Sequence, residues 1–221
     1  MSDDRQTTDL DDLQQRPELD DRLDESMLPA SPLELFSRWM ADVLTAGLPE
    51  PTAMALATVS ADGRPRARMV LLKDYGDSGF TFYTNRTSRK GSDLAEVPRA
   101  SLLFPWYPLQ RQVIIEGTVT PLSTADSESY FRSRPRGSQL GAWSSRQSTV
   151  IGSRAELDDR YAELTERWPD GTPVPMPDFW GGYRVEPQII EFWHGRVNRM
   201  HDRFRYRPQP GGGWAAERLA P

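Results

Sequence analysis

The sequence predicts a mainly β protein with peripheral helices, built as one small β-barrel. Short runs of β-forming residues recur along the chain, and turn residues such as Asp62-Gly63 and Asp77-Ser78-Gly79 separate them. Strands spaced so closely favour an antiparallel sheet or barrel, which helical segments interrupt in blocks. A chain of 221 residues with 37% hydrophobic content can bury one sizeable core but hardly two.

The N-terminal segment, residues 1–27, differs in composition from the rest of the chain. Ten acids stand against three arginines, aromatic residues are absent, and few apolar groups could offset the entropy of ordering. We expect residues 1–27 to form an acidic tail that is disordered or loosely docked. Residues 28–221 are then the folded domain.

The folded domain is expected to begin with a helix. Ser31-Pro32-Leu33-Glu34 combines a capping-box spacing with a proline at the first helical position, and apolar residues follow at helical intervals up to Gly47. A second capping-box pattern at Ser153-Arg154-Ala155-Glu156 predicts another helix. The remaining expected elements are strands at 53–59, 67–73, 80–84, 100–104 and 113–120, a helix at 124–132, and strands at 182–185, 189–193, 204–206 and 214–219.

Composition excludes several classes of function. The chain has no cysteine and only two histidines, which leaves no thiol chemistry and little for a metal centre, so we expect no metal. The formal net charge of -5 opposes nonspecific attraction to nucleic acid. The longest apolar runs fall short of the roughly 18–20 residues of a membrane span, and the acidic start is unlike a secretory signal. We therefore expect a cytoplasmic protein without nucleic-acid or membrane partners.

Four clusters of basic residues are the candidate binding sites. In residues 68–73, alternation places Arg68, Val70 and Leu72 on one side of a strand and Met69, Leu71 and Lys73 on the other. Residues 83–90 end a strand in a loop of hydroxyls, amides and cations, the groups that bind phosphate. Taken alone, the first cluster is better explained by solvated strand ends, and the second fits an exposed turn equally well.

The other two clusters are denser. Residues 130–138 bring Arg132, Arg134 and Arg136 together with Tyr130 and Ser138 without a neighbouring acid, so a phosphate site and a basic surface are evenly matched. Residues 193–203 end an aromatic strand in Arg199, His201 and Arg203. If residues 199–203 are extended, these three side chains point to one side, where they could surround an anionic or electron-rich ring; a basic loop balanced by Asp202 is the alternative. Glycine-rich nucleotide loops of the usual kinds are absent from the sequence.

Taken together, these segments resemble the pyridoxamine 5'-phosphate oxidase family from about Ser31 to Pro221. The resemblance rests on several motifs in one order: RMVLLK (68–73), SLLFPW (101–106), SRPR (133–136) with GAW (141–143), FWGG (179–182), EFW (191–193), RMHDR (199–203) and the final RLAP. It implies an FMN-binding split β-barrel, a homodimer with FMN in clefts between subunits, and a C-terminal region for dimerisation and substrate binding.

The resemblance also assigns site residues and an activity. Flavin contacts fall on Arg68, Met69, Val70, Leu71, Leu72, Lys73, Tyr83, Thr84, Arg89, Lys90, Gln112, Gln147, Ser148, Trp193 and Arg203. Substrate contacts fall on Lys73, Tyr130, Arg134, Ser138, Arg199, Met200 and His201, of which Arg199 and His201 would be catalytic. The implied reaction oxidises pyridoxamine or pyridoxine 5'-phosphate to pyridoxal 5'-phosphate, with O2 as electron acceptor and H2O2 as product.

One departure from the family and two alternative functions remain open. Family members often carry an arginine-rich, tyrosine-containing motif near the N-terminus, and Leu13-Gln14-Gln15-Arg16-Pro17 is at best a remnant of it. This departure puts a lid over the substrate in doubt. The alternatives are another split-barrel flavoprotein such as an FMN reductase, and a noncatalytic carrier of FMN or pyridoxal phosphate.

Overall fold

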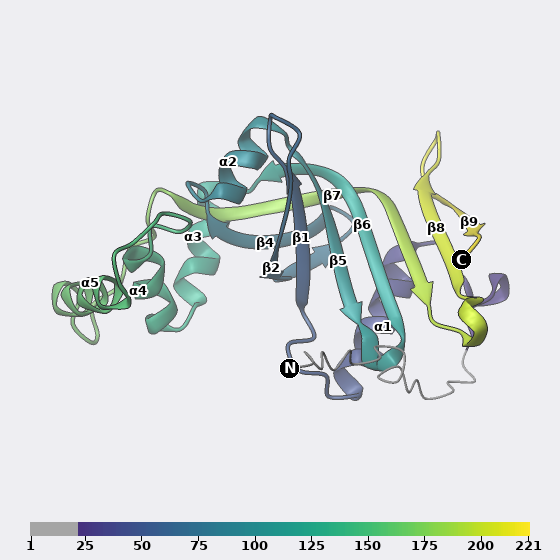
Figure 1. Ribbon diagram of the computed structural model, residues 1–221, viewed down its shortest axis with the longest axis horizontal. Helices are drawn as coiled ribbons and strands as arrows, with labels where there is room; N and C mark the ends of the chain where they lie inside the picture. The colour runs from purple at the N-terminus through teal and green to yellow at the C-terminus, as the bar shows by residue number, and fades with distance from the viewer. Residues whose placement is uncertain (1–21) are drawn as a thin grey trace, which may run out of the picture.

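A computed structural model of the chain describes residues 22–221, and its centre is an antiparallel sheet that curls on itself (Figure 1). The strand order is β2-β1-β5-β6-β7-β4-β3, with β8 added to β7 and β9 added to β8. The predicted mainly β class with peripheral helices is confirmed. The described residues include no helix that is both long and apolar enough to cross a membrane.

The strands fall where β-forming residues alternate with polar ones. Their bounds are β1 Ala53–Val59, β2 Pro65–Leu71, β3 Asp74–Gly76, β4 Gly79–Asn85, β5 Arg99–Trp106, β6 Arg111–Pro121, β7 Trp180–His194, β8 Asp202–Pro208 and β9 Trp214–Leu219. The alternation expected around residue 68 is confirmed, because Arg68 and Val70 are half-buried while Met69 and Leu71 are exposed. The expected strands at 182–185 and 189–193 are one strand, β7. The pairing of β7 with β6 shifts register at Glu116/Gly117, opposite the polar middle of β7. Position 117 is a glycine because a Cβ atom there would collide with the backbone carbonyl of Glu186.

The first helix, α1 (Pro32–Thr45), closes the main core. Ser31 caps it as predicted, since its hydroxyl accepts a hydrogen bond from the Leu33 amide at 3.3 Å. Phe36 is fully buried and meets Phe80 and Phe104 edge to face, both at 5.1 Å between ring centroids. The helix thereby covers the inner side of the curled sheet.

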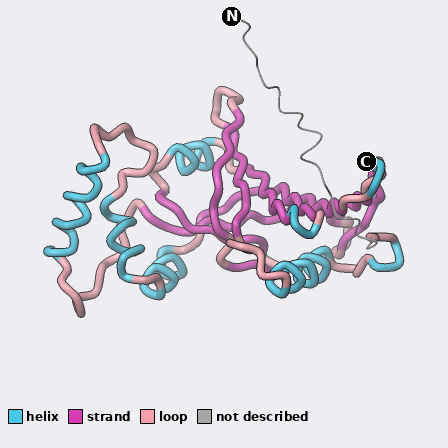
Figure 2. The backbone as a smooth tube through the Cα atoms, turned by 60° about the horizontal axis from the view of Figure 1, so that its bottom comes forward, coloured by secondary structure: helices cyan, strands magenta, loops and turns pink. Residues whose placement is uncertain are grey.

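The other helices gather mainly at one end of the sheet (Figures 1 and 2). They are α3 (Thr124–Ser133), α4 (Arg136–Ser144) and α5 (Arg154–Arg167), and a second small core of Phe131, Leu140, Val174 and Trp180 lies there. Short 3-10 turns lie at η1 (Glu25–Met27), η2 (Tyr107–Leu109) and η3 (Val197–Arg199). Neither α4 nor α2 (Arg89–Glu96) was predicted from the sequence, because both contain few apolar residues at helical spacing.

The N-terminal part of the described chain packs against the last two strands. Residues 1–21 of the expected tail lie outside the described residues, but Leu23 is buried and its amide donates to Asp202 Oδ2 at 3.3 Å. Glu25 pairs with Arg218 at 2.6 Å. Residues 22–27 are therefore docked on the domain, and not loosely attached as expected for the whole 1–27 segment. With only Leu23 and Met27 as apolar residues, the sequence of this segment gave little sign of docking.

Candidate active site

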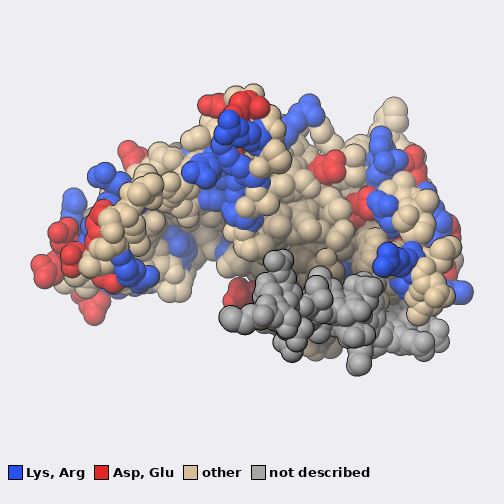
Figure 3. Space-filling model, in the orientation of Figure 1, with Lys and Arg blue, Asp and Glu red and all other residues tan. Residues whose placement is uncertain are grey.

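A cationic groove of about 570 Å³ lies between strand β2 and helix α2. It is lined by Arg66, Ala67, Arg68, Met69, Arg89, Lys90, Gln147 and Ser148. Figure 3 shows basic side chains gathered in this part of the surface. On the strand side of the groove, alternation along β2 places Arg66 and Arg68 on the same face. On the helix side, Ser88 caps α2, and the first helical turn supplies Arg89 and Lys90.

Lys90 is the most buried cation of this groove. Its Nζ donates to Thr84 Oγ1 at 2.8 Å, to Ser88 Oγ at 3.0 Å and to Gln147 Oε1, and all three of these acceptors are neutral. Burial, and then the neighbouring Arg68, lower the pKa of Lys90 to about 8. A buried ammonium without a carboxylate beside it is stabilised by an anion, so this groove fits a phosphate group.

A second groove of about 420 Å³ adjoins the first and shares Met69, Lys90 and Gln147 with it. Its lining brings together the four predicted substrate-phosphate residues, Lys73, Tyr130, Arg134 and Ser138. The rest of its lining consists of Met69, Val70, Leu71, Tyr83, Thr84, Lys90, Ser133, Pro135, Gln147 and Trp180, of which seven were predicted to contact a flavin. Residues from β2, β4, α3, α4 and the loop after α4 therefore meet in one continuous depression.

Arg134 is held in this second groove by aromatic rings. Its guanidinium lies over Trp180 at 4.8 Å and over Phe131 at 5.5 Å from the ring centroids. Burial lowers the pKa of Arg134, and its buried Nη1 has no hydrogen-bond partner among the described residues. Aromatic faces stabilise the cation without offering an acceptor that would compete for its donors, so Arg134 can bind an incoming anion with them.

An aromatic stack supports the wall beside Arg134. Tyr83 stacks on Tyr130 at 4.0 Å and on Trp180 at 5.3 Å between centroids. Burial, and then Tyr130, raise the pKa of Tyr83, which keeps its hydroxyl protonated at neutral pH. The stack packs β4, α3 and β7 against one another beside the groove.

Seven predicted site residues line neither groove, and one of them, Leu72, is buried in the main core. The other six lie on β6, β7, η3, the two residues that follow η3, and β8: Gln112, Trp193, Arg199, Met200, His201 and Arg203. In this second group Gln112 pairs with Trp193 across β6 and β7, and Trp193 packs on His201 at 4.6 Å. Arg203 is bound to Glu191 at 2.7 Å. One chain therefore presents the predicted site as two separate groups.

The extended conformation predicted for residues 199–203 is wrong. Asn198 and Arg199 have positive φ angles of 56° and 60°, and strand β8 begins only at Asp202. The backbone turns because the amide of Arg196 donates to His201 Nδ1 at 3.0 Å, which closes a loop over η3. Arg199, His201 and Arg203 therefore do not share one face of a strand.

Arg66 and Trp180 are site residues that were missing from the prediction. Arg66 lies two positions before Arg68 on β2, so strand alternation could have placed it on the same face. Trp180 belongs to a motif that the resemblance includes, but its place beneath Arg134 depends on packing between β7 and α3.

Comparison with protein families decides the relationship. The family model described as pyridoxamine 5'-phosphate oxidase matches residues 40–167, and the model described as the pyridoxine 5'-phosphate oxidase C-terminal dimerisation region matches residues 180–221. The chain belongs to the pyridoxamine 5'-phosphate oxidase family.

Relatives in this family cover nearly the whole chain. The pyridoxine/pyridoxamine 5'-phosphate oxidase of Frankia alni is 57% identical over 203 residues, which cover 90% of this chain and 84% of that protein. The enzyme of the same name from Bordetella petrii is 54% identical over 95% of this chain and 98% of its own length. A match over 95% of the chain spans the stretch that holds both groups of predicted site residues.

Two solved structures share the fold of this chain. PhzG from Burkholderia lata, in complex with tetrahydrophenazine-1-carboxylic acid, has a TM-score of 0.85 at 33% identity and covers 93% of this chain and 100% of that chain. A pyridoxamine 5'-phosphate oxidase-related, FMN binding protein from Nostoc punctiforme has a TM-score of 0.68 at 14% identity, covering 86% and 98%, which supports the fold alone. The predicted split-barrel class is confirmed.

Proposed function

We propose that this protein oxidises pyridoxamine 5'-phosphate and pyridoxine 5'-phosphate to pyridoxal 5'-phosphate, using FMN, with O2 as electron acceptor and H2O2 as product. With the amine substrate, water hydrolyses the resulting imine to the aldehyde and ammonia is released. The observation that carries the proposal is the pair of cations, Lys90 and Arg134, that lie in adjoining grooves without a carboxylate partner. A reaction between a flavin monophosphate and a phosphorylated substrate needs two anion sites in one depression, one for each ligand.

The groove between β2 and α2 has the donors that the FMN phosphate requires. Arg68, Arg89, Lys90 and Ser148 would bind the phosphate, while Gln147 and the exposed edge of β2 would contact the rest of the cofactor. FMN, when bound, supplies the two-electron redox chemistry that amino-acid side chains lack. The contribution of the chain is to bind and orient the cofactor beside the second groove.

The second groove would bind the substrate through its phosphate. Arg134 contributes free N–H donors, and Lys73, Tyr130 and Ser138 add a cation and two hydroxyls around it. An anchored phosphate leaves the pyridine ring and its C4' carbon to be oriented by other groups. Unphosphorylated vitamers should accordingly bind poorly.

A second copy of the chain would complete the site. Arg199, Met200 and His201, which are expected to flank the substrate ring, lie outside the grooves of their own chain, together with Gln112, Trp193 and Arg203. The matched C-terminal model is described as a dimerisation region and spans most of these residues. In a homodimer, Arg199 of the partner subunit and His201 of the partner subunit would position C4' and complement the charge that changes during hydride transfer.

The two alternative functions make different use of the grooves. A noncatalytic carrier would bind FMN or pyridoxal phosphate and release no peroxide. Against an FMN reductase stand the residues that the family resemblance assigns to the vitamer phosphate, Tyr130, Arg134 and Ser138, which meet in the second groove. The high identity to enzymes named for both phosphorylated vitamers also favours the oxidase.

The deciding experiment separates the two half-reactions. The full chain is loaded with FMN, mixed anaerobically with either phosphorylated vitamer, and followed by flavin absorbance before oxygen is admitted and peroxide and pyridoxal 5'-phosphate are measured. We expect bleaching by both vitamers and recovery with oxygen. Bound FMN that neither vitamer reduces would refute the oxidase function and leave the carrier.

A further inference from the structure

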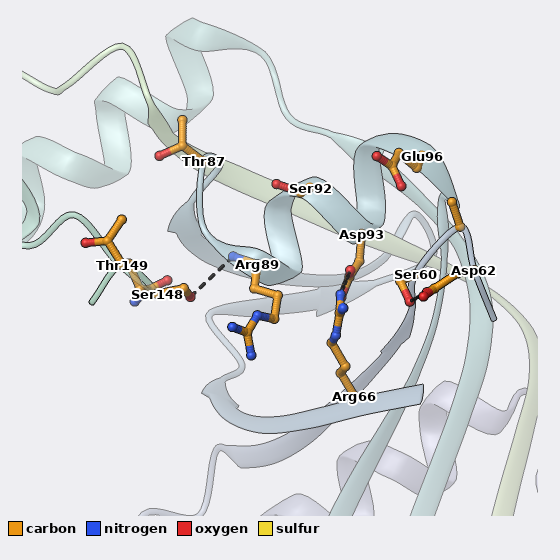
Figure 4. Close-up of a pocket in the computed structure, with 12 residues that line it drawn as sticks. Ser60, Asp62, Arg66, Thr87, Arg89, Ser92, Asp93, Glu96, Ser148 and Thr149 are labelled. Carbon is orange, nitrogen blue, oxygen red and sulfur yellow. Dashed lines mark hydrogen bonds and ion pairs between the residues drawn. The ribbon is translucent and has the colours of Figure 1, made fainter. Parts of the chain in front are cut away.

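Beneath the arginines of the first groove lies a buried carboxylate, that of Asp93 on α2. Its side chain accepts hydrogen bonds from Thr58 Oγ1 at 2.7 Å and from Arg66 Nη1, and it lies 3.8 Å from Arg68 Nη2. Asp93 is 2% exposed, whereas Arg66 reaches the groove surface. Figure 4 shows the Arg66 and Asp93 side chains meeting end to end between strand and helix.

The fold accounts for this arrangement. Strands β1 and β2 pair so that Thr58 lies opposite Arg66 and Leu56 lies opposite Arg68. Arg68 Nη1 then donates to the Leu56 carbonyl at 3.0 Å and to Thr58 Oγ1 at 2.8 Å. Helix α2 packs on β1, and this packing brings the Asp93 carboxylate to Thr58 and to both arginines. Asp93 therefore holds the guanidinium groups of Arg66 and Arg68 from the side of the helix.

A carboxylate in this position has two opposing effects on anion binding. Its negative charge weakens the attraction of the groove for a phosphate. Its hydrogen bonds, however, hold two long side chains in one geometry, which removes the entropy that they would otherwise lose on binding. Four cations line the groove, Arg66, Arg68, Arg89 and Lys90, so one shared carboxylate leaves a clear excess of positive charge.

We propose that Asp93 is a positioning residue for the cofactor phosphate, and that Arg66, which it holds beside Arg68, is a further phosphate-binding residue. Arg66 shares its strand face with Arg68 and lines the same groove. Lys90 and Asp93 are three positions apart on α2 and so lie on one face of the helix. The helix thus contributes Lys90 to the groove and, through Asp93, orients Arg66 and Arg68. The inference rests on FMN being the cofactor.

The test compares FMN with riboflavin, which lacks the phosphate. Dissociation constants are measured by flavin fluorescence quenching on the full chain freed of flavin, for wild type, Asp93→Asn, Arg66→Gln and the control Arg64→Gln. Arg64 is exposed and lies on the same hairpin as Arg66, and Arg64→Gln removes the same single positive charge as Arg66→Gln. Loss of a charge-assisted contact should raise the FMN constant roughly 10-fold or more in Asp93→Asn and Arg66→Gln, and leave riboflavin within about 2-fold. Arg64→Gln should change neither.

The sign of the Asp93→Asn effect separates positioning from plain charge. FMN binding that stays the same or tightens would overturn the proposal, because removing a negative charge alone strengthens anion binding. Equal losses for FMN and riboflavin would also overturn it, since they indicate general damage. If Asp93→Asn does not fold, Arg66→Gln decides, and an FMN constant equal to that of Arg64→Gln overturns the proposal. Wild type that binds FMN but oxidises neither vitamer would refute the oxidase function and leave this inference standing.

Discussion

The two groups of predicted site residues differ in how their charges are balanced. In the grooves, Lys90 has only neutral partners and Arg134 lies on aromatic rings with an unpaired donor. Near the C-terminus, Arg203 is paired with Glu191 at 2.7 Å and Arg218 with Asp202 at 2.8 Å. Both groups look equally basic in the sequence, but Lys90 and Arg134 in the grooves have no acidic partner among the described residues, whereas the charge of Arg203 is balanced by Glu191. The comparison separates cations that have no acidic partner in the described chain from cations whose charge is already balanced within it.

The largest expected effect tests whether the C-terminal group nevertheless serves catalysis. Replacing Arg199 with Met keeps much of the side-chain volume and removes the guanidinium, so FMN occupancy should survive. Loss of one preorganised electrostatic contact costs on the order of 10²–10³ in rate. Anaerobic flavin reduction followed by stopped flow should slow by that amount, with His201→Asn slowing it less. Reduction at the wild-type rate would confine the C-terminal group to a structural role.

Arg134 should show the next largest effect, on substrate affinity alone. Arg134→Ala removes a charge-assisted contact worth about 1.5–3 kcal/mol, so the phosphorylated vitamers should bind roughly 10–150-fold more weakly while FMN remains bound. Titration of flavin absorbance with each ligand measures this, and Arg132→Ala, which removes an exposed arginine paired with Glu128, is the matched control. Equal losses for pyridoxine and its phosphate would show that Arg134 does not bind the phosphate.

A smaller effect should come from the titration of Lys90. Its pKa in the free protein is about 8, and a bound phosphate raises that pKa, so proton uptake accompanies FMN binding as pH rises above 8. FMN affinity should therefore fall by up to about tenfold per pH unit above pH 8, until the pKa of the complex is reached. Riboflavin affinity should stay level over the same range. A flat FMN profile, or one unchanged by Lys90→Gln, would remove Lys90 from the phosphate site.

The smallest effect on chemistry is expected from the segment docked beside the C-terminal strands. Leu23→Ala removes a buried side chain and should lower the free energy of unfolding by about 2–4 kcal/mol, measured by urea denaturation. FMN affinity should change little, because Leu23 lines neither groove. Leu44→Ala, at an exposed helix position, is the control and should cost far less. A loss of FMN affinity in Leu23→Ala alone would mean that docking of this segment supports the cofactor site.

The sequence by itself determined most elements and indicated most of the residues that meet in the two grooves. Alternation placed Arg68 and Met69 on opposite sides of β2, and the capping pattern at Ser31 located the start of α1, because both depend on neighbours within a few residues. The motifs around Lys73, Tyr130, Arg134 and Ser138 correctly indicated residues that meet in one groove. Local periodicity and family motifs were sufficient for these predictions.

Only the tertiary structure decided which charges are paired and which are free. The Arg66–Asp93 pair joins residues 27 positions apart, and its existence depends on how α2 packs over β1, which no local pattern records. The turn at Asn198 and Arg199 depends on a hydrogen bond from the backbone to His201, so a prediction from strand spacing failed there. Hydrogen bonds and ion pairs between distant segments form only after those segments pack, and for that reason charge balance at the site could be established only in the folded chain.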